Sequence, residues 1–225
     1  MPGFASHPDV PDPLLVLDPR VLPTRVADRA FFAGPTKTVA RRLLGGWLVR
    51  NRRGRTFGAR IVEVEAYLGE KDAAAHSYGG RRTPRVEPMY GPGGFFYVYP
   101  VYGMHYCANV VTRGRGIPEA VLLRAAEHPG SPPALLRGPA KLCRAFGIVR
   151  GDSGKDLVGS IDFEIRLDSA PRREIEASPR IGVDYAGEAA TWPLRFFLRN
   201  HPAVSGRRVS GVTRRSARSP SSSTR

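Results

Sequence analysis

The stretch RIVEVEAY at residues 60–67 alternates between apolar and polar side chains, which is the period of a β-strand. Successive side chains of a strand point to opposite faces of its sheet, so the apolar ones share one face: Val62, Val64 and Ala66. The other face carries the polar ones: Glu63, Glu65 and Tyr67. The sequence therefore predicts two carboxylates and a phenol side by side on one strand.

Further elements are predicted on both sides of this strand. A helix is expected over 38–44, ended by Gly45 and Gly46, and a strand over 47–50. Aromatic and β-branched runs predict strands over 95–99 and 104–112. The remaining elements are strands over 119–126, 163–167 and 194–198 and a helix over 138–148. Because strands cluster in the middle and helices are few, we expect an α+β fold, a single domain with a curved, mostly antiparallel mixed sheet and short flanking helices.

The two ends of the chain differ from this middle part. Residues 1–28 carry six prolines without a sustained period, so we expect an extended or disordered N-terminal arm. Residues 205–225 contain six Arg and no acid, so we expect a basic disordered tail. The folded unit is therefore expected over 29–204. Because the tail supplies +6 of the total charge of +15, the first 204 residues keep +9.

Net charge and cysteine usage limit the classes of partner. Lys and Arg number 35 against 20 Asp and Glu, which favours a polyanion, nucleic acid before an anionic membrane. No apolar run reaches the ~18 residues of a membrane span, and the start of the chain lacks a signal-peptide pattern. Cys107 and Cys143 have no metal-ligand spacing, so we expect no metal, cofactor or disulfide framework. We expect a monomer, cytoplasmic and nucleoid-associated in a bacterium or nuclear in a eukaryote.

Several long segments, in one order, resemble a known family. They are IVEVEAYLGEKDAAAHSYGGRRTPR (61–85), FFYVYPVYGMHYCANVV (95–111), VLLRAAEHP (121–129), GPAKLC (138–143), RIGVDYAGE (180–188) and PLRFFLR (193–199). Over about residues 29–204 the chain resembles the alkyladenine (3-methyladenine) DNA glycosylase family. The resemblance implies a monofunctional enzyme of base excision repair, which flips alkylated or deaminated purines out of duplex DNA and hydrolyses the N-glycosidic bond. The substrates it implies are 3-methyladenine, 7-methylguanine, hypoxanthine and ethenoadenine.

The resemblance gives Glu65 the role of general base. Hydrolysis of an N-glycosidic bond passes through an oxocarbenium-like state, which a carboxylate can stabilise while it activates the attacking water. Glu63 lies on the same face, and only the match of Glu65-Ala66-Tyr67 to the family decides between the two acids. No Lys falls in a matching catalytic position, so water is the expected nucleophile, with no lyase step. Arg124, which interrupts an apolar strand, matches a residue beside the catalytic water and the phosphate of the flipped nucleotide.

The resemblance also implies a pocket for the flipped base. Tyr67, His76 and Tyr99 match its aromatic walls, and stacking on such a side chain is worth ~1–3 kcal/mol per base. Asn109 matches the residue that excludes the 2-amino group of guanine. Without the resemblance, the rings would be interpreted as packing residues and Asn109 as an amide bonded within the sheet.

Contacts with double-stranded DNA are expected from one turn and one loop. Tyr102 matches the residue that enters the minor groove and fills the gap left by the flipped nucleotide, where wedges are usually apolar or aromatic. The loop residues expected to contact DNA are Arg81, Arg82, Thr83 and Arg85, with Met89 just downstream. An ordinary hairpin tyrosine and a solvated loop are the alternatives. The family pattern transfers least at residues 87–94, EPMYGPGG.

A non-catalytic nucleic-acid-binding module is the competing hypothesis, because the fold is similar to the C-terminal domain of methionyl-tRNA formyltransferase. Basic charge and exposed aromatic side chains would fit structured RNA equally well. The strand face with Glu65 separates the two hypotheses, since a carboxylate aimed at a phosphate backbone weakens binding unless it performs chemistry.

Overall fold

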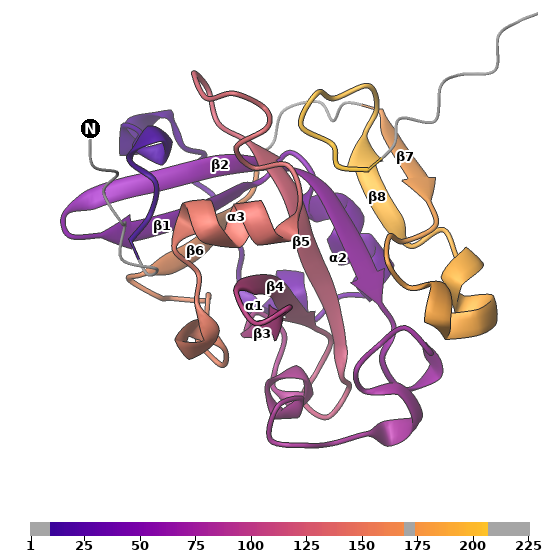
Figure 1. The fold of residues 1–225 in the computed structure, drawn as a ribbon. Helices are drawn as coiled ribbons and strands as arrows, with labels where there is room; N and C mark the ends of the chain where they lie inside the picture. Colours follow the sequence, from indigo (N-terminus) through magenta and orange to yellow (C-terminus); the bar gives the residue numbers. More distant parts are fainter. Residues whose placement is uncertain (1–9, 169–173, 207–225) are drawn as a thin grey trace, which may run out of the picture.

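The computed structural model describes residues 10–168 and 174–206, which form an eight-stranded sheet with short helices (Figure 1). The strands are β1 (Trp47–Arg52), β2 (Arg55–Tyr67), β3 (Phe96–Val101), β4 (His105–Thr112), β5 (Glu119–Glu127), β6 (Phe163–Arg166), β7 (Ile175–Ser178) and β8 (Arg195–Leu198). Their order is β3-β4-β5-β2-β1-β6, and β8 pairs with both β2 and β7. All pairings between these named strands are antiparallel, which confirms the α+β class and leaves no parallel pair among them.

The described part of the chain contains three short α-helices: α1 (Arg29–Phe32), α2 (Thr36–Leu43) and α3 (Pro139–Phe146). The predicted helix over 138–148 is confirmed as α3, because Pro139 at its first position and left-handed Gly147 after its last are favourable end residues. Helix α2 packs on β2 and β5, and α3 packs on β4 and β5. No helix in the described ranges is both long and apolar enough to cross a bilayer.

Strand β2 lies in the centre of the fold and is covered on both faces. Its apolar face, with Val62, Val64 and Ala66, belongs to the main core, together with side chains of all three helices. Its opposite face is buried as well, since Glu63 and Glu65 are each 0% exposed. The alternation was therefore predicted correctly, but the polar face does not meet solvent. Burying two carboxylates is costly unless each finds charged or hydrogen-bonding partners, so this face is where a site is expected.

The described part of the N-terminal arm, from residue 10, is packed on the domain. Two 3₁₀ helices, Pro13–Leu15 and Pro19–Val21, start at prolines that follow aspartates whose side chains cap them. Leu15 is fully buried in the main core, and Val16 makes an isolated β-bridge with Phe57 of β2. Residues 10–28 thus bury apolar side chains despite lacking a regular period.

The last described residues, near residue 206, also pack into the interior of the domain. Ser205, which the expected boundary assigns to the tail, is 7% exposed, and its backbone N–H donates to Glu63 at 2.6 Å. Residues 205 and 206 of the expected basic tail are described, and its other residues, 207–225, lie outside the described residues.

Candidate active site

Arg124 of β5 lies between the two buried carboxylates of β2. In the register of this pair, Leu122 is opposite Glu65 and Ala125 is opposite Glu63, and the ladder shifts around Glu63. Irregularities of this kind are common next to active sites because they redirect a side chain. Arg124 is two residues from Leu122 and so points to the face that carries both acids. Its Nε lies 3.1 Å from Glu63 Oε1 and its Nη1 3.2 Å from Glu65 Oε1.

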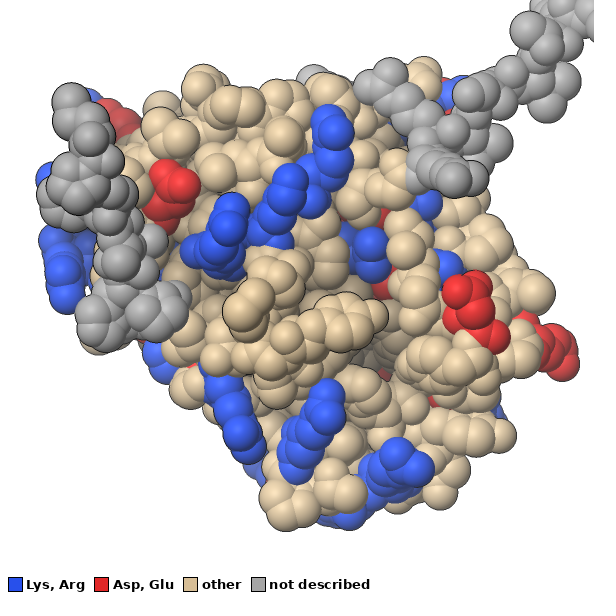
Figure 2. All heavy atoms as spheres, viewed as in Figure 1, with Lys and Arg blue, Asp and Glu red and all other residues tan. Residues whose placement is uncertain are grey.

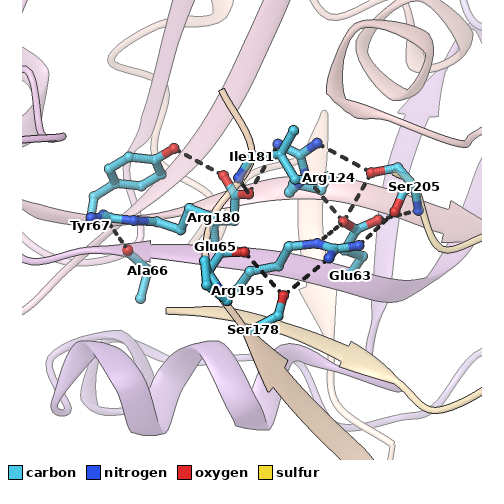
Figure 3. Close-up of polar contacts among 11 residues, drawn as sticks. Glu63, Glu65, Ala66, Tyr67, Arg124, Ser178, Arg180, Ile181, Arg195 and Ser205 are labelled. Atoms are coloured by element: carbon cyan, nitrogen blue, oxygen red, sulfur yellow. Dashed lines mark hydrogen bonds and ion pairs between the residues drawn. The ribbon is translucent and has the colours of Figure 1, made fainter. Parts of the chain in front are cut away.

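Glu63 is held by four hydrogen bonds from the protein (Figure 3). Its Oε1 accepts hydrogen bonds from Arg124, from Arg195 Nε at 2.6 Å and from the Ser205 hydroxyl at 2.9 Å. Its Oε2 accepts the Ser205 backbone N–H. Three of these four contacts fall on Oε1 and one on Oε2. Glu63 therefore acts as the anchor of an ion-pair cluster.

Glu65 keeps one acceptor position open. Its Oε1 accepts the backbone N–H of Ile181 at 2.8 Å and faces Arg124, whereas its Oε2 accepts the Tyr67 hydroxyl at 2.9 Å (Figure 3). Within the described chain that hydroxyl is the one hydrogen-bond donor to Oε2, so this oxygen can accept a second hydrogen bond. The two acids differ in their partners: Arg195 and Ser205, which bind Glu63, are not in the lining of the neighbouring cavity, whereas Tyr67 and Ile181, which bind Glu65, are.

A cavity of ≈ 220 Å³ opens beside Glu65. Its lining includes most of the site residues expected from the sequence: Tyr67, His76, Met89, Tyr99, Tyr102, Asn109 and Arg124. Glu65 is not itself in the lining, but its three contacts are, namely Tyr67, Arg124 and Ile181. The open oxygen of Glu65 therefore lies directly behind the wall of a cavity rich in aromatic rings.

The aromatic walls are locked to one another and carry no charge at neutral pH. His76 Nδ1 lies 2.7 Å from the Tyr97 hydroxyl, and the His76 ring packs edge-on against Tyr99 with centroids 4.6 Å apart. Burial, followed by the charges of Arg85 and Arg81, lowers the pKa of His76 below its usual value, so the imidazole is neutral. Burial raises the pKa of Tyr97 to about 12, which keeps its phenol protonated.

Tyr67 is held from behind by a buried ion pair. The Arg180 guanidinium lies 4.7 Å from the centroid of the Tyr67 ring and makes a bidentate pair with Asp72, at 2.5 and 2.8 Å. Burial, and then the charge of Glu65, raises the pKa of Tyr67 well above its usual value. The phenol therefore stays a hydrogen-bond donor to Glu65.

The two polar residues that interrupt apolar strands both reach the cavity. Asn109 is 4% exposed, and its Nδ2 donates to the Tyr97 carbonyl at 3.0 Å, so it is an in-sheet amide and a lining residue at once. Burial alone would lower the pKa of Arg124, but the nearby charges of Glu65 and Glu63 raise it. The guanidinium therefore remains charged inside the site.

The β3–β4 turn projects an exposed aromatic side chain. Tyr102 is 93% exposed and has a φ of 50°, an uncommon left-handed conformation for a bulky residue. Gly103 follows with a φ of 73°, which glycine adopts without strain. Met104 beside it is 81% exposed. The expected turn is confirmed, and the apolar tip is larger than one residue.

The exposed side chains of the basic loop differ in whether they pair with a carboxylate. Arg81, Thr83 and Arg85 are exposed, and the Arg85 guanidinium lies 5.5 Å from the Tyr99 ring centroid at the cavity. Arg82 pairs with Glu87 at 2.6 Å, which neutralises much of its charge. Met89 is only 2% exposed, so it lies in the cavity wall and not on the outer surface of the loop.

Sequence reasoning missed several residues of the site. Tyr97 lines the cavity, and its two-residue spacing from Tyr99 on one strand could have revealed it. The segment from Ile181 to Val183 and Tyr185 also lines the cavity, but it comes from a remote loop without periodicity. No group of three or more His, Cys, Asp or Glu in the described ranges could hold a metal ion, and both cysteines are free and buried.

Comparison with known proteins identifies the family. A family model described as methylpurine-DNA glycosylase (MPG) matches residues 30–202. The chain belongs to this family. A relative from Desulfitobacterium hafniense (strain Y51) is 47% identical over 197 residues, which cover 79% of this chain and 97% of the relative. Another, from Bdellovibrio bacteriovorus, is 42% identical over 194 residues, with 80% and 98% covered. Both relatives are assigned as 3-methyladenine DNA glycosylases.

The protein is accordingly a DNA glycosylase, a hydrolase of base excision repair that acts on DNA. The family assignment favours this activity over a non-catalytic nucleic-acid-binding module. In the glycosylase, the cavity and the carboxylate behind it come from strands far apart in sequence, β2, β3, β4 and β5, and from the loop before β8.

Proposed function

We propose that this glycosylase removes 3-methyladenine and 7-methylguanine, and also hypoxanthine and ethenoadenine, from duplex DNA by hydrolysis alone. The observation that carries the proposal is the open Oε2 of Glu65, fully buried and directly behind the ring-lined cavity. An extruded purine nucleotide in this cavity would have its anomeric carbon near a water molecule held by that oxygen. Such a water is the expected nucleophile of a monofunctional enzyme.

The reaction then needs one base and no covalent enzyme intermediate. As the bond from C1′ to the base nitrogen breaks, its electron pair leaves with the base, and positive charge develops on the sugar. Glu65 stabilises this charge and takes a proton from the attacking water, whose oxygen bonds to C1′. A base that is already cationic, such as 3-methyladenine, departs neutral without further help. A neutral base such as hypoxanthine requires a proton from another source.

The cavity walls suit electron-poor purines. Tyr67, His76 and Tyr99 are rings without net charge, so a cationic base gains from stacking on their faces. Stacking of ~1–3 kcal/mol per base offsets much of the few kcal/mol needed to unstack a nucleotide. Met89 contributes to this pocket, and Asn109 faces the base edge, where it opposes the 2-amino group of normal guanine.

The exposed tip and the basic loop complete the proposed DNA contacts. Tyr102 enters the minor groove and fills the gap left by the extruded nucleotide, and its left-handed backbone is the kind of strain that accumulates at functional sites. Arg81, Thr83 and Arg85 contact phosphates. Arg82 contributes less, because Glu87 already binds it. We further propose that the protein works as a monomer and, since the relatives compared are bacterial, on the nucleoid in the cytoplasm.

A Glu65→Gln variant tests the proposal. Glutamine is nearly isosteric, and its carbonyl oxygen can accept the Ile181 N–H while its amide group donates to the Tyr67 hydroxyl, so the fold should survive while the base is lost. The expected result is normal binding to duplex DNA with 3-methyladenine and loss of base release by at least about 100-fold, the lower range for general-base catalysis. Glu70→Gln is the matched control, because Glu70 is exposed and outside the cavity lining. Unchanged release by Glu65→Gln would remove Glu65 as the base.

A further inference from the structure

A hydrogen bond joins the loop that carries His76 to strand β3 at the wall of the cavity. The Tyr97 hydroxyl oxygen lies 2.7 Å from His76 Nδ1, and the two rings are nearly perpendicular, with an angle of 89° between their planes. Both side chains line the cavity, but His76 comes from the loop after β2 and Tyr97 from β3. Which of the two rings donates in this hydrogen bond decides what the imidazole offers to the cavity.

The direction of this hydrogen bond follows from the partners of the Tyr97 hydroxyl. Burial raises the pKa of Tyr97 to about 12, and the charge and a hydrogen bond of Arg85 oppose the rise, so the phenol keeps its proton at neutral pH. A guanidinium has donors and no acceptor, so Arg85 can only donate to the phenol oxygen. Tyr97 is 2% exposed, and His76 Nδ1 is the one acceptor for the phenol proton among the described residues. The Tyr97 hydroxyl therefore donates to His76 Nδ1, since a buried proton without an acceptor would be costly.

The other ring nitrogen of His76, Nε2, is left with the proton of the neutral imidazole. Burial, and then the charges of Arg85 and Arg81, lower the pKa of His76, so the ring does not carry a second proton at neutral pH. Figure 2 shows Lys and Arg side chains over the lower part of the face, where Figure 1 places the chain between β2 and β3 that holds these two arginines. In the part of the chain that the structure describes, no group forms a hydrogen bond with Nε2. The cavity wall thus contains an N–H donor that the described protein leaves unused.

We propose that Tyr97 is a positioning residue, which holds His76 as the Nε2–H tautomer and leaves that N–H to donate to a hydrogen-bond acceptor of the extruded nucleotide. The inference rests on the proposed function, because an extruded nucleotide is what fills the cavity. A neutral N–H forms a hydrogen bond and keeps its proton, so His76 orients the nucleotide and does not protonate the leaving base. Either nitrogen of a neutral imidazole can carry the proton, and the hydrogen bond to one nitrogen selects the other. Tyr97 makes this selection before the nucleotide binds, which lowers the cost of ordering the ring.

Nuclear magnetic resonance of the free protein tests the tautomer without any substrate. Long-range proton–nitrogen correlation spectra distinguish protonated from unprotonated imidazole nitrogens, and the chain has five histidines. Comparison with the spectrum of His76→Gln identifies the His76 signals. At neutral pH we expect the proton on Nε2 and an unprotonated, hydrogen-bonded Nδ1, whose signal should shift in Tyr97→Phe. A proton on Nδ1, or a doubly protonated ring, would overturn the inference, and this result is obtained from the parent protein even if a variant fails to fold.

A double-mutant cycle tests whether Tyr97 acts through His76. Tyr97→Phe keeps the ring and removes the hydroxyl, so it should slow single-turnover release of 3-methyladenine by about 2- to 12-fold, the range for one net hydrogen bond. In a His76→Phe background the same change should alter release by less than about twofold, because the group on which the hydroxyl acts is already gone. Equal slowing in both backgrounds would show that the hydroxyl works independently of His76. That outcome refutes the inference, and so does a parent rate for Tyr97→Phe alone.

Tyr90→Phe is the matched control, because it removes a hydroxyl from the same buried apolar cluster. The Tyr90 hydroxyl donates to the Arg81 carbonyl at 3.0 Å, but Tyr90 is outside the cavity lining. The control should keep the parent signals of His76 and a release rate within about twofold of the parent. If both tyrosine variants slow release equally, loss of any buried hydroxyl explains the effect and the role of Tyr97 is refuted.

The tautomer and the proposed function fail in different ways. A parent protein that released no base from duplex DNA with 3-methyladenine would contradict the proposed function, whereas the spectrum of His76 would still report on Tyr97. Thermal denaturation checks that each variant is folded before its release rate is compared.

Discussion

Loss of the buried Arg180–Asp72 ion pair should lower the free energy of unfolding. Both side chains are 0% exposed. Besides its two contacts with Asp72, Arg180 donates to the carbonyls of Ala66 and Ala189, at 3.0 and 3.1 Å. Asp72 in turn accepts the backbone N–H of Leu68. One ion pair therefore joins the end of β2, the loop that leads to His76 and the 3₁₀ helix Asp184–Thr191.

Replacing Arg180 with methionine keeps much of the apolar stem but leaves the Asp72 carboxylate buried and unpaired. Breaking a buried pair in this way costs about 3–5 kcal/mol of the free energy of unfolding. For a chain of this size, 1 kcal/mol corresponds to a shift in Tm of about 2–4 °C. We therefore expect Arg180→Met to lower Tm by roughly 6–20 °C. The double variant with Asp72→Asn should recover part of this loss, because it removes the unpaired charge.

Urea and thermal denaturation monitored by circular dichroism measure this effect, with Arg199→Met as the control. Arg199 pairs with Glu174 and Glu176, but its side chain is 48% exposed, so solvent screens the interaction and stability should change little. A loss below about 1 kcal/mol for Arg180→Met would refute the reasoning that a buried charge is left behind. An equal loss for both variants would show that burial does not decide the cost.

Three further outcomes follow from the site. Tyr102→Ala should slow release of 3-methyladenine from duplex DNA in single-turnover assays, and a rate equal to the parent's would rule out a wedge at the β3–β4 tip. The pKa of His76 is lowered in the folded protein, so the neutral imidazole contributes stability above pH ~6.5 that is lost as pH falls through the folded-state pKa. His76→Gln should therefore make the urea midpoint depend less on pH in that range. An unaltered dependence would contradict this. Deleting residues 207–225 should make the salt dependence of DNA binding shallower with little change in Tm. A deletion of residues 205–225 should also lower Tm, because Glu63 loses two hydrogen bonds. Equal melting temperatures for the two deletions would refute this role of Ser205.

Local sequence was sufficient for elements whose signals are local. The alternation of β2 and the proline and glycine at the ends of α3 each specify backbone geometry within a few residues, and the structure agrees with both. Strand β7 was missed because Ile175–Ser178 holds few apolar residues and pairs with a single strand, β8. Residues 1–28 were expected to be extended or disordered because their prolines follow no sustained period. The burial of Leu15 could not be predicted in this way, since it depends on partners remote in sequence.

The site was predictable as a set of residue types and not as an arrangement. The resemblance named seven of the residues that line the cavity, but the contacts that distinguish Glu63 from Glu65 come from remote segments of the chain. Arg195 and Ser205 satisfy the first acid, and Ile181 restrains the second. The burial of Met89 likewise depends on neighbours such as Tyr97 and Val111, which no local pattern specifies.

The link between Ser205 and Glu63 has a consequence for the order in which the enzyme matures. A ribosome makes β2 early and residue 205 much later, so a growing chain holds Glu63 and its two arginines in an incomplete cluster. Until residue 205 emerges and docks, Glu63 lacks the two hydrogen bonds that Ser205 donates. We therefore expect a chain broken off before residue 205 to be less stable, because Glu63 then lacks both hydrogen bonds from Ser205.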